Sequence, residues 1–195
     1  MREIKKVLVA GAGTMGMSIA QSFAEKEFTV IVYDISQESI AQGKKLLRLN
    51  QEARIKSKKI NETQSEQLVS RIGFTTDLEE AKEVDFVTES VVERLEVKHD
   101  FWSKVSRLVD EEVLLTTNTS GLSISSIAQA VKGPERFVGM HWFNPPHIIP
   151  LIEVINGDKT TDSAAEAVSE LAKTLGKKPV RVKKDVPGFA ANRVQ

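Results

Sequence analysis

The sequence predicts an α/β fold: a doubly wound, mostly parallel sheet with helices on both faces and an inserted helical hairpin. Two observations support it. Short apolar runs alternate with amphipathic stretches along most of the chain. In addition, a strand, a helix and a second strand are predicted within the first 33 residues. That is the spacing of a βαβ unit, whose crossover is expected to be right-handed.

The first elements are predicted from local patterns. Residues 7–10 form a continuous apolar run, as buried parallel strands do. A helix with one apolar face follows over residues 14–26, and a β-branched and aromatic strand over residues 28–33. Residues 36–70 are helical in character, with Ser36 as a candidate N-cap. Their length indicates two helices with a break near residues 60–63.

The rest of the chain continues the alternation. We predict strands at residues 72–75, 84–88, 113–117, 137–140, 151–155 and 179–182, and helices at 95–109, 123–130 and 162–175. Gly176 is a candidate C-cap for the last helix. The chain contains no repeat and no low-complexity linker, so one domain is expected over residues 1–195.

Composition limits the function classes. The 195 residues contain 27 basic and 27 acidic side chains, so no overall field favours nucleic acid or an acidic membrane as a partner. The chain has no cysteine, which excludes disulfides, thiolate metal sites and cysteine nucleophiles, and we predict no metal site. No apolar segment approaches the length of a membrane span or a signal sequence. A cytoplasmic location is therefore expected.

A glycine-rich turn follows the first strand. It matches the pattern G-x-G-x-x-G, with Gly11, Gly13, Thr14, Met15 and Gly16 as candidate cofactor-binding residues. The glycines allow a tight turn, the approach of a pyrophosphate and close packing of helix on strand. The helix N-terminus then offers free N–H groups to the phosphates. Strand, turn and helix together predict a Rossmann-type dinucleotide site.

Asp34 ends the second predicted strand. A carboxylate at this place can bind both hydroxyls of the adenosine ribose and would repel a 2′-phosphate. No arginine or lysine follows within several residues, so NAD is favoured over NADP. The alternative is a glycine turn without a ligand and an incidental surface aspartate.

Residues 41–60 are strongly basic. They contain seven cationic side chains against the single acid Glu52, and Lys56, Lys58 and Lys59 are the candidates for binding the nucleotide of coenzyme A. The alternative is a solvated helix face, which charge alone favours.

Three polar segments fall near predicted strand ends: residues 117–121, 140–146 and 185–193. Ligands of open α/β sheets bind outside the carboxyl ends of strands, which makes Ser120 and His141 candidate site residues. Glu153 lies in the following strand, within reach of the histidine. Of the other histidines, His99 is expected at the surface and His147 is an alternative base.

The motifs GAGTMG, ESVVERLEVK, TNTSGL, MHWFNP, LIEV and DVPGFAANR together resemble the NAD-dependent L-3-hydroxyacyl-CoA dehydrogenase family over the whole chain. The resemblance implies that His141 and Glu153 form the catalytic pair and that Ser120 and Asn192 contact the substrate. The cofactor residues that it implies are Asp34, Glu93, Lys98, Ser120 and Asn144, and we add Asn118 from the same polar loop.

These residue types suit the oxidation of a secondary alcohol. A histidine titrates near the working pH and can take the hydroxyl proton. A carboxylate behind it fixes the tautomer and stabilises the imidazolium. Hydrogen-bond donors such as Ser120 and Asn192 stabilise an oxygen that becomes anionic during the reverse reduction.

Two departures keep alternatives open. Family members continue into a helical domain that supplies most of the homodimer contact, and the chain ends before it, so the cofactor-binding domain alone is expected. The segments NPPHIIPLIEV and ANRVQ, and Gly121 after Ser120, are more similar to the sequences of relatives that act on L-gulonate or carnitine. The leading prediction is oxidation of L-3-hydroxyacyl-CoA in fatty acid or butanoate metabolism. A non-thioester 3-hydroxy acid substrate and an inactive NAD-binding module remain as alternatives.

Overall fold

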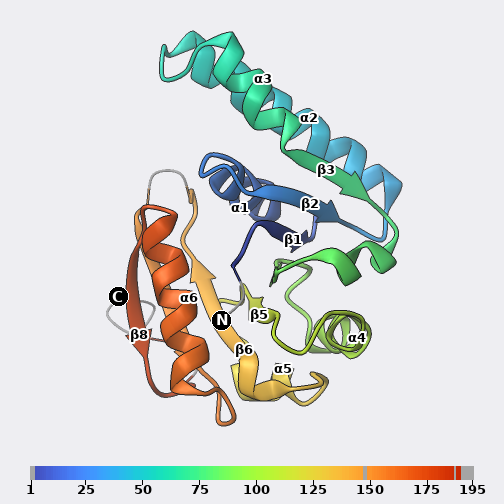
Figure 1. Ribbon diagram of the computed structural model, residues 1–195, viewed down its shortest axis with the longest axis vertical. Helices are drawn as coiled ribbons and strands as arrows, with labels where there is room; N and C mark the ends of the chain where they lie inside the picture. Colours follow the sequence, from blue (N-terminus) through green and yellow to red (C-terminus); the bar gives the residue numbers. More distant parts are fainter. Residues whose placement is uncertain (1–2, 147–148, 187, 190–195) are drawn as a thin grey trace.

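The structure is a computed structural model that describes residues 3–146, 149–186 and 188–189. In these residues one eight-stranded sheet has the order β3-β2-β1-β4-β5-β6-β7-β8 (Figure 1). The strands are β1 Lys6–Ala10, β2 Thr29–Tyr33, β3 Ile72–Thr75, β4 Phe86–Glu89, β5 Leu114–Thr117, β6 Phe137–Trp142, β7 Leu151–Asn156 and β8 Lys178–Val182. The chain leaves β1 on one side and returns to its other side with β4, which confirms the predicted doubly wound topology.

Adjacent strands are parallel in every pair except β6 and β7. In this antiparallel pair His141 lies directly opposite Glu153. Such cross-strand neighbours have their Cβ atoms about 5 Å apart on the same face of the sheet. The sheet is therefore mostly parallel, as predicted, and its antiparallel strands β6 and β7 carry the candidate catalytic pair.

Helices cover both faces of the sheet. They are α1 Thr14–Ala24, α4 Leu95–Leu108, α5 Ile124–Ala128 and α6 Asp162–Thr174, with short 3-10 helices at Leu78–Glu83 and Pro134–Arg136. The alternation of β1 shows how the layers form. Val7 and Val9 belong to the core under α1 and α6, whereas Leu8 and Ala10 belong to the core under α4 and α5. Burial on both faces explains why the strand is continuously apolar.

The predicted hairpin over residues 36–70 is confirmed as α2 (Gln37–Lys56) and α3 (Glu62–Ser70), which project beyond the sheet (Figure 1). The Ser36 hydroxyl accepts a first-turn N–H at 3.2 Å and so caps α2. Asn61 and Gln64 form a reciprocal capping box at the start of α3. The break between the helices is therefore set by local capping, slightly earlier than expected.

A buried polar network joins this hairpin to α1. Gln51 donates from Nε2 to Gln21 Oε1 at 2.9 Å, and Ser65 donates from its hydroxyl to Gln51 Oε1 at 3.3 Å. All three side chains are buried. The sequence pattern did not predict this network, because a glutamine in an amphipathic helix ordinarily faces water.

Two expectations need correction. β6 extends to Trp142, two residues beyond its predicted end, so His141 lies within the strand. His99 was expected at the surface, and this is wrong: the ring is half-buried and its Nε2 lies 2.7 Å from the Ser126 carbonyl oxygen. Helix α4 packs against α5 there, which gives the polar ring a partner.

Backbone conformation and close packing explain why the first and third positions of the turn are glycine. Gly11 has φ +103°, a conformation that side chains rarely adopt. A Cβ on Gly16 would lie 1.9 Å from the Gly11 carbonyl oxygen, whereas a Cβ on Gly13 would meet nothing within 4 Å. The third glycine therefore allows α1 to pack on the turn, and the space in front of Gly13 stays open for a ligand.

We expect Gly16→Ala to lower the free energy of unfolding by about 1–3 kcal/mol, because its methyl group overlaps backbone that cannot move without separating α1 from β1. Gly13→Ala is the matched control and is expected to cost less than about 1 kcal/mol. Denaturant unfolding of both variants measures the difference. Equal stability of the Gly16→Ala variant and the parent chain would contradict the packing role.

Candidate active site

The N-terminus of α1 is open to an anion. Its N-cap residue, Gly13, makes no side-chain cap hydrogen bond. In the first turn Thr14 is exposed and Met15 is half-buried. First-turn N–H groups have no intrahelical partner and carry a positive partial charge. Together with the space in front of Gly13, these groups fit a pyrophosphate, as the glycine pattern predicts.

Asp34 stands immediately after β2 and is half-buried. Its Oδ2 accepts the Ala12 N–H at 2.9 Å and its Oδ1 accepts the Ser36 N–H at 3.0 Å. The carboxylate thus joins the glycine turn to the start of the hairpin. Because an ionised carboxylate has about four acceptor positions, two remain for ribose hydroxyls.

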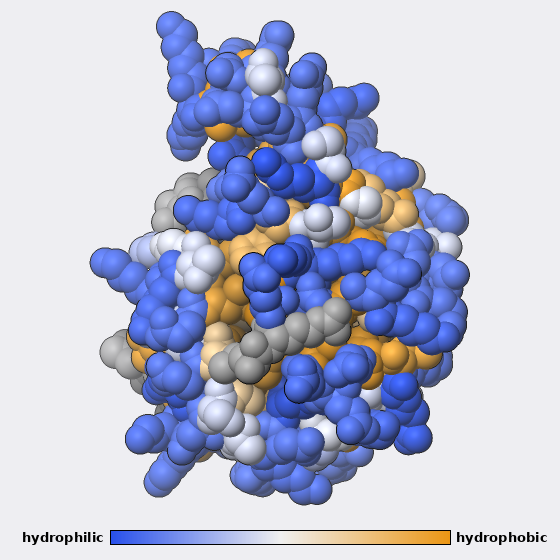
Figure 2. Space-filling model, in the orientation of Figure 1, coloured by the Kyte–Doolittle hydropathy of each residue, from blue (hydrophilic) through white to orange (hydrophobic). Residues whose placement is uncertain are grey.

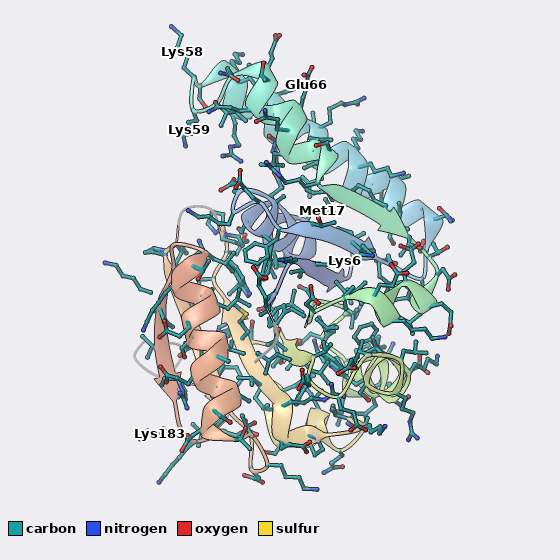
Figure 3. All side chains as sticks on the ribbon, viewed as in Figure 1. Lys6, Met17, Lys58, Lys59, Glu66 and Lys183 are labelled. Carbon is teal, nitrogen blue, oxygen red and sulfur yellow. The ribbon has the colours of Figure 1, made fainter. Side chains whose placement is uncertain are left out.

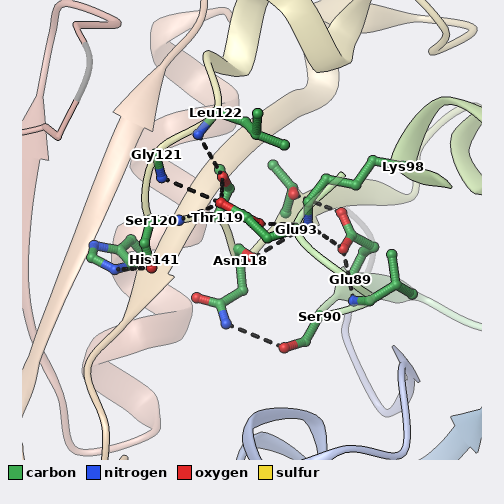
Figure 4. Close-up of polar contacts among 12 residues, drawn as sticks. Glu89, Ser90, Glu93, Lys98, Asn118, Thr119, Ser120, Gly121, Leu122 and His141 are labelled. Atoms are coloured by element: carbon green, nitrogen blue, oxygen red, sulfur yellow. Dashed lines mark hydrogen bonds and ion pairs between the residues drawn. The ribbon is translucent and has the colours of Figure 1, made fainter. Parts of the chain in front are cut away.

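The catalytic candidates His141 and Glu153 are in direct contact. The two side chains are 5% and 1% exposed, and His141 Nδ1 lies 2.7 Å from Glu153 Oε2. The other ring nitrogen, Nε2, lies 3.1 Å from the Ser120 hydroxyl (Figure 4). An ionised carboxylate only accepts hydrogen bonds, so Nδ1 carries the proton that it shares with Glu153. Nε2 is then directed toward Ser120.

Two aromatic rings pack near the histidine. The ring centroids of Phe143 and Phe189 lie 4.6 and 5.7 Å from that of His141. Phe189 is buried and belongs to the segment that contains Asn192. That asparagine and the alternative base His147 lie outside the described residues, so their predicted roles stay predictions.

Glu93 holds the loop that follows β5. Its Oε1 accepts the N–H groups of Ser120 at 3.0 Å and Gly121 at 3.3 Å, and also the Thr119 hydroxyl (Figure 4). Burial raises the pKa of Glu93, but the Thr119 hydrogen bond, the nearby Lys98 charge and the two N–H groups outweigh it. The pKa is therefore below its ordinary value. Glu93 is 43% exposed and forms a charged border of the site.

A buried ion pair lies behind this loop. Lys98 Nζ lies 2.5 Å from Glu89 Oε1, and neither side chain is exposed. The same ammonium lies 3.4 Å from Glu93 Oε2 and donates to the Asn118 carbonyl oxygen at 3.4 Å. Lys98, a predicted cofactor residue, is thus fully buried and supports the loop from behind. A direct contact with the cofactor stays a prediction.

Glu89 is a buried carboxylate of this site that the sequence motifs did not indicate. Its Oε2 accepts the Thr117 hydroxyl at 2.6 Å and the Trp102 indole N–H at 3.2 Å, and its Oε1 also accepts the Val91 N–H at 2.9 Å. The available signal was a carboxylate at the end of an apolar strand, nine residues before a lysine. An ionised group at such a buried position needs a partner of this kind.

The two asparagine candidates differ in exposure. Asn118 donates from Nδ2 to the Ser90 hydroxyl at 3.2 Å and accepts the Trp142 N–H at 3.0 Å. It therefore connects the ends of β4, β5 and β6. Asn144 lies two residues beyond β6 and is exposed. Its exposed side chain is placed for a ligand contact, whereas that of Asn118 is largely engaged within the protein.

The basic candidates Lys56, Lys58 and Lys59 are exposed at the end of α2 and in the turn that follows it. Figure 3 shows Lys58 and Lys59 at the tip of the hairpin, and we call the three lysines the basic tip. Within the described part of the chain none of the three forms an ion pair, whereas Arg54 is paired with Glu25 of α1. The three lysines thus belong to the hairpin, whereas His141 lies in β6 of the sheet.

A groove runs between α1 and the C-terminal part of α2, beside the buried contact of Gln21 with Gln51. It is lined by polar side chains that include Ser18, Ser22, Glu25, Asn50, Arg54 and Lys59. Figure 2 shows the hairpin as a largely hydrophilic lobe standing off the rest of the molecule. Because the groove reaches Ser18, one turn from the start of α1, it runs from the basic tip toward the glycine turn.

These features describe a site with two kinds of groups. One end offers backbone N–H groups and Asp34 to a dinucleotide, and the other offers a buried, carboxylate-oriented histidine as a base. Among the residues that the structure describes, no group of three or more candidate ligands is arranged to hold a metal ion. No helix in the described chain is long and apolar enough to cross a bilayer.

Comparison with known proteins agrees with this arrangement. The profile of the family described as "3-hydroxyacyl-CoA dehydrogenase, NAD binding domain" matches residues 6–186. A "Probable 3-hydroxybutyryl-CoA dehydrogenase" of Bacillus subtilis is 38% identical over 98% of this chain and 67% of that protein. The "Fatty acid oxidation complex subunit alpha" of Acinetobacter baumannii is 40% identical over 98% of this chain but only 26% of that protein.

A solved structure gives the same result. The crystal structure of (S)-3-hydroxybutyryl-CoA dehydrogenase from Ralstonia eutropha is 35% identical and superposes with a TM-score of 0.94, over 98% of this chain and 68% of that one. The chain thus spans between about a quarter and two thirds of the proteins that it matches. The geometry of the glycine turn with Asp34, and of His141 with Glu153, agrees with the family profile. We conclude that this chain belongs to the 3-hydroxyacyl-CoA dehydrogenase family, as its NAD-binding domain.

Proposed function

We propose that the chain supplies the cofactor-binding and acid–base part of an enzyme that oxidises L-3-hydroxyacyl-CoA to 3-oxoacyl-CoA in fatty acid or butanoate metabolism. The observation that carries this proposal is the line of hydrogen bonds from Glu153 through His141 to Ser120. It lies at the edge of the sheet where the glycine turn and Asp34 fit NAD.

The residues divide the work. Nε2 of His141 takes the hydroxyl proton of the substrate, and Glu153 stabilises the resulting imidazolium through Nδ1–H. The Ser120 hydroxyl, 3.1 Å from Nε2, orients the substrate oxygen between itself and the ring. NAD⁺, when bound, supplies the acceptor for the hydride that leaves the same carbon. Phe143 and Phe189 restrict water around the ring, which strengthens these electrostatic interactions.

The basic tip supports coenzyme A as the handle of the substrate. Lys56, Lys58 and Lys59 are exposed cations without ion-pair partners among the described residues, and phosphates are the ligands such clusters attract. The groove along α1 extends from Lys59 of the tip to Ser18, one turn from the start of α1. A non-thioester 3-hydroxy acid is the second candidate substrate, supported by the same dyad but making no use of the tip.

The cellular setting is also part of the proposal. A chain without cysteine suits the reducing cytoplasm, and a small-molecule substrate suits a chain with no net charge. A longer form carrying the helical domain is expected to be a homodimer. An NAD-binding module that turns over no substrate on its own is the alternative for the 195 residues alone.

The first test concerns cofactor choice. NAD is expected to bind at least about tenfold more tightly than NADP, because Asp34 would face the 2′-phosphate with like charge; this is about 1.4 kcal/mol. Asp34→Asn should narrow the gap, chiefly by weakening NAD, while the exposed Asp158→Asn should not. Calorimetric titration with both cofactors measures it, and equal affinities in the parent chain would exclude this role of Asp34.

The second test concerns the substrate handle. Replacing Lys56, Lys58 and Lys59 by Ala is expected to weaken acyl-CoA binding by about 1–2 kcal/mol, and less at high salt, since exposed charges act weakly. Binding of the N-acetylcysteamine thioester of the same acyl group, which lacks the nucleotide, should not change. The control removes three exposed lysines elsewhere, Lys104, Lys132 and Lys173. Unchanged acyl-CoA affinity at low salt would favour the non-thioester substrate.

The third test concerns the base and uses a form extended by the helical domain. His141→Ala is expected to lower kcat about 10²–10⁴-fold. Glu153→Gln should also lower kcat, and the double variant should lose little more than His141→Ala alone, because the pair acts as one unit. NADH oxidation with acetoacetyl-CoA gives the rates, and NAD titration confirms folding. Loss of turnover in His147→Ala but not in His141→Ala would move the base to His147.

A further inference from the structure

Three charged side chains are connected by ion pairs behind the loop that carries Ser120. Glu89 and Lys98 form the buried ion pair, and Glu93 lies toward solvent at 3.4 Å from the ammonium. One positive and two negative charges leave a net charge of −1. Because the cation is already paired at 2.5 Å with Glu89, the remaining negative charge resides on the exposed end, at Glu93.

That charge is close to the reacting part of the cofactor if the proposed function holds, and the inference rests on it. Hydride transfer requires the nicotinamide ring beside the substrate carbon whose hydroxyl meets His141 Nε2. Ser120 lies 3.1 Å from that nitrogen, and its backbone N–H donates to Glu93 at 3.0 Å. One residue thus separates the carboxylate from the reacting groups.

We propose that Glu93 determines a preference for the oxidised over the reduced form of the cofactor. The nicotinamide ring is positively charged in NAD⁺ and neutral in NADH, so a nearby carboxylate attracts only the oxidised ring. The phosphates, riboses and adenine are identical in the two forms. A fixed charge at this place therefore changes the ratio of the two affinities, whereas contacts elsewhere change both alike.

The surroundings leave this charge in place. Four contacts hold the carboxylate: the Thr119 hydroxyl, the N–H groups of Ser120 and Gly121, and Lys98. The same contacts keep the pKa of Glu93 below its ordinary value, against the opposing effect of burial. The nearby guanidinium of Arg94 is exposed and paired with Glu96, so it offers Glu93 little neutralisation.

The test is the ratio Kd(NAD⁺)/Kd(NADH), measured by calorimetry on the 195-residue chain. Glu93→Gln keeps the acceptor oxygen for the loop and removes the charge, and is expected to raise the ratio about three- to tenfold. Glu93→Asp keeps the charge and should stay within about twofold of the parent ratio. Glu80→Gln, the same charge change at an exposed acid of the 3-10 helix Leu78–Glu83, should stay within about twofold as well.

A second variant covers the case in which Glu93→Gln binds neither form. Val92 precedes Glu93 in the loop between β4 and α4, and it is 64% exposed. Val92→Lys adds a cation beside Glu93 and should raise the ratio Kd(NAD⁺)/Kd(NADH) relative to Val92→Gln. An unchanged ratio in Glu93→Gln, or in Val92→Lys where only that can be measured, overturns the proposal. Failure of the parent chain to bind either form would instead overturn the proposed function.

Discussion

The burial of the Glu89–Lys98 ion pair constrains the whole carboxyl edge of the sheet. Two charges taken out of water are tolerated only with close geometry and with their remaining hydrogen-bond positions filled. Here two side chains and a backbone N–H fill those of Glu89, which ties β4, β5 and α4 together. Lys98 then reaches Glu93, and Glu93 holds the backbone of Ser120. The distance from Ser120 to His141 therefore depends on an ion pair that is buried behind the loop.

The sequence predicted the fold well because the strands between the two edge strands are largely buried on both faces. Such strands are rich in apolar residues, and the glycine and capping signals between them are local. The candidate site was predicted only in part. Its residues fall near strand ends, which the sequence pattern indicates. The pattern does not indicate which polar side chains pair with each other across a long separation, such as the 28 positions between Glu89 and Thr117. Glu89 and the buried Gln51 network were missed for this reason. Both form hydrogen bonds between different helices and strands, whereas the periodicity of apolar residues indicates only which positions are buried.

The molecule offers phosphates two different environments. At the glycine turn, backbone N–H groups and the dipole of α1 supply the attraction without any net charge. Close packing at Gly16 and the hydrogen bond from the Ala12 N–H to Asp34 fix the shape of this turn. At the hairpin tip, flexible lysines supply full charges in solvent, where each is worth little and salt screens it. The first environment suits a cofactor held in one orientation. The second suits the distant handle of a substrate that must arrive and leave at every turnover.

The single antiparallel pair in the sheet explains how the base is oriented. In an antiparallel ladder two residues can lie directly opposite each other on one face, and β6 and β7 place His141 and Glu153 in that relation. The carboxylate thus meets Nδ1 through the backbone register itself. Nε2 is left facing the loop of Ser120, which Glu93 positions separately. The proton acceptor is therefore fixed by the sheet, while the groups that present the substrate and cofactor to it are set by the ion-paired loop.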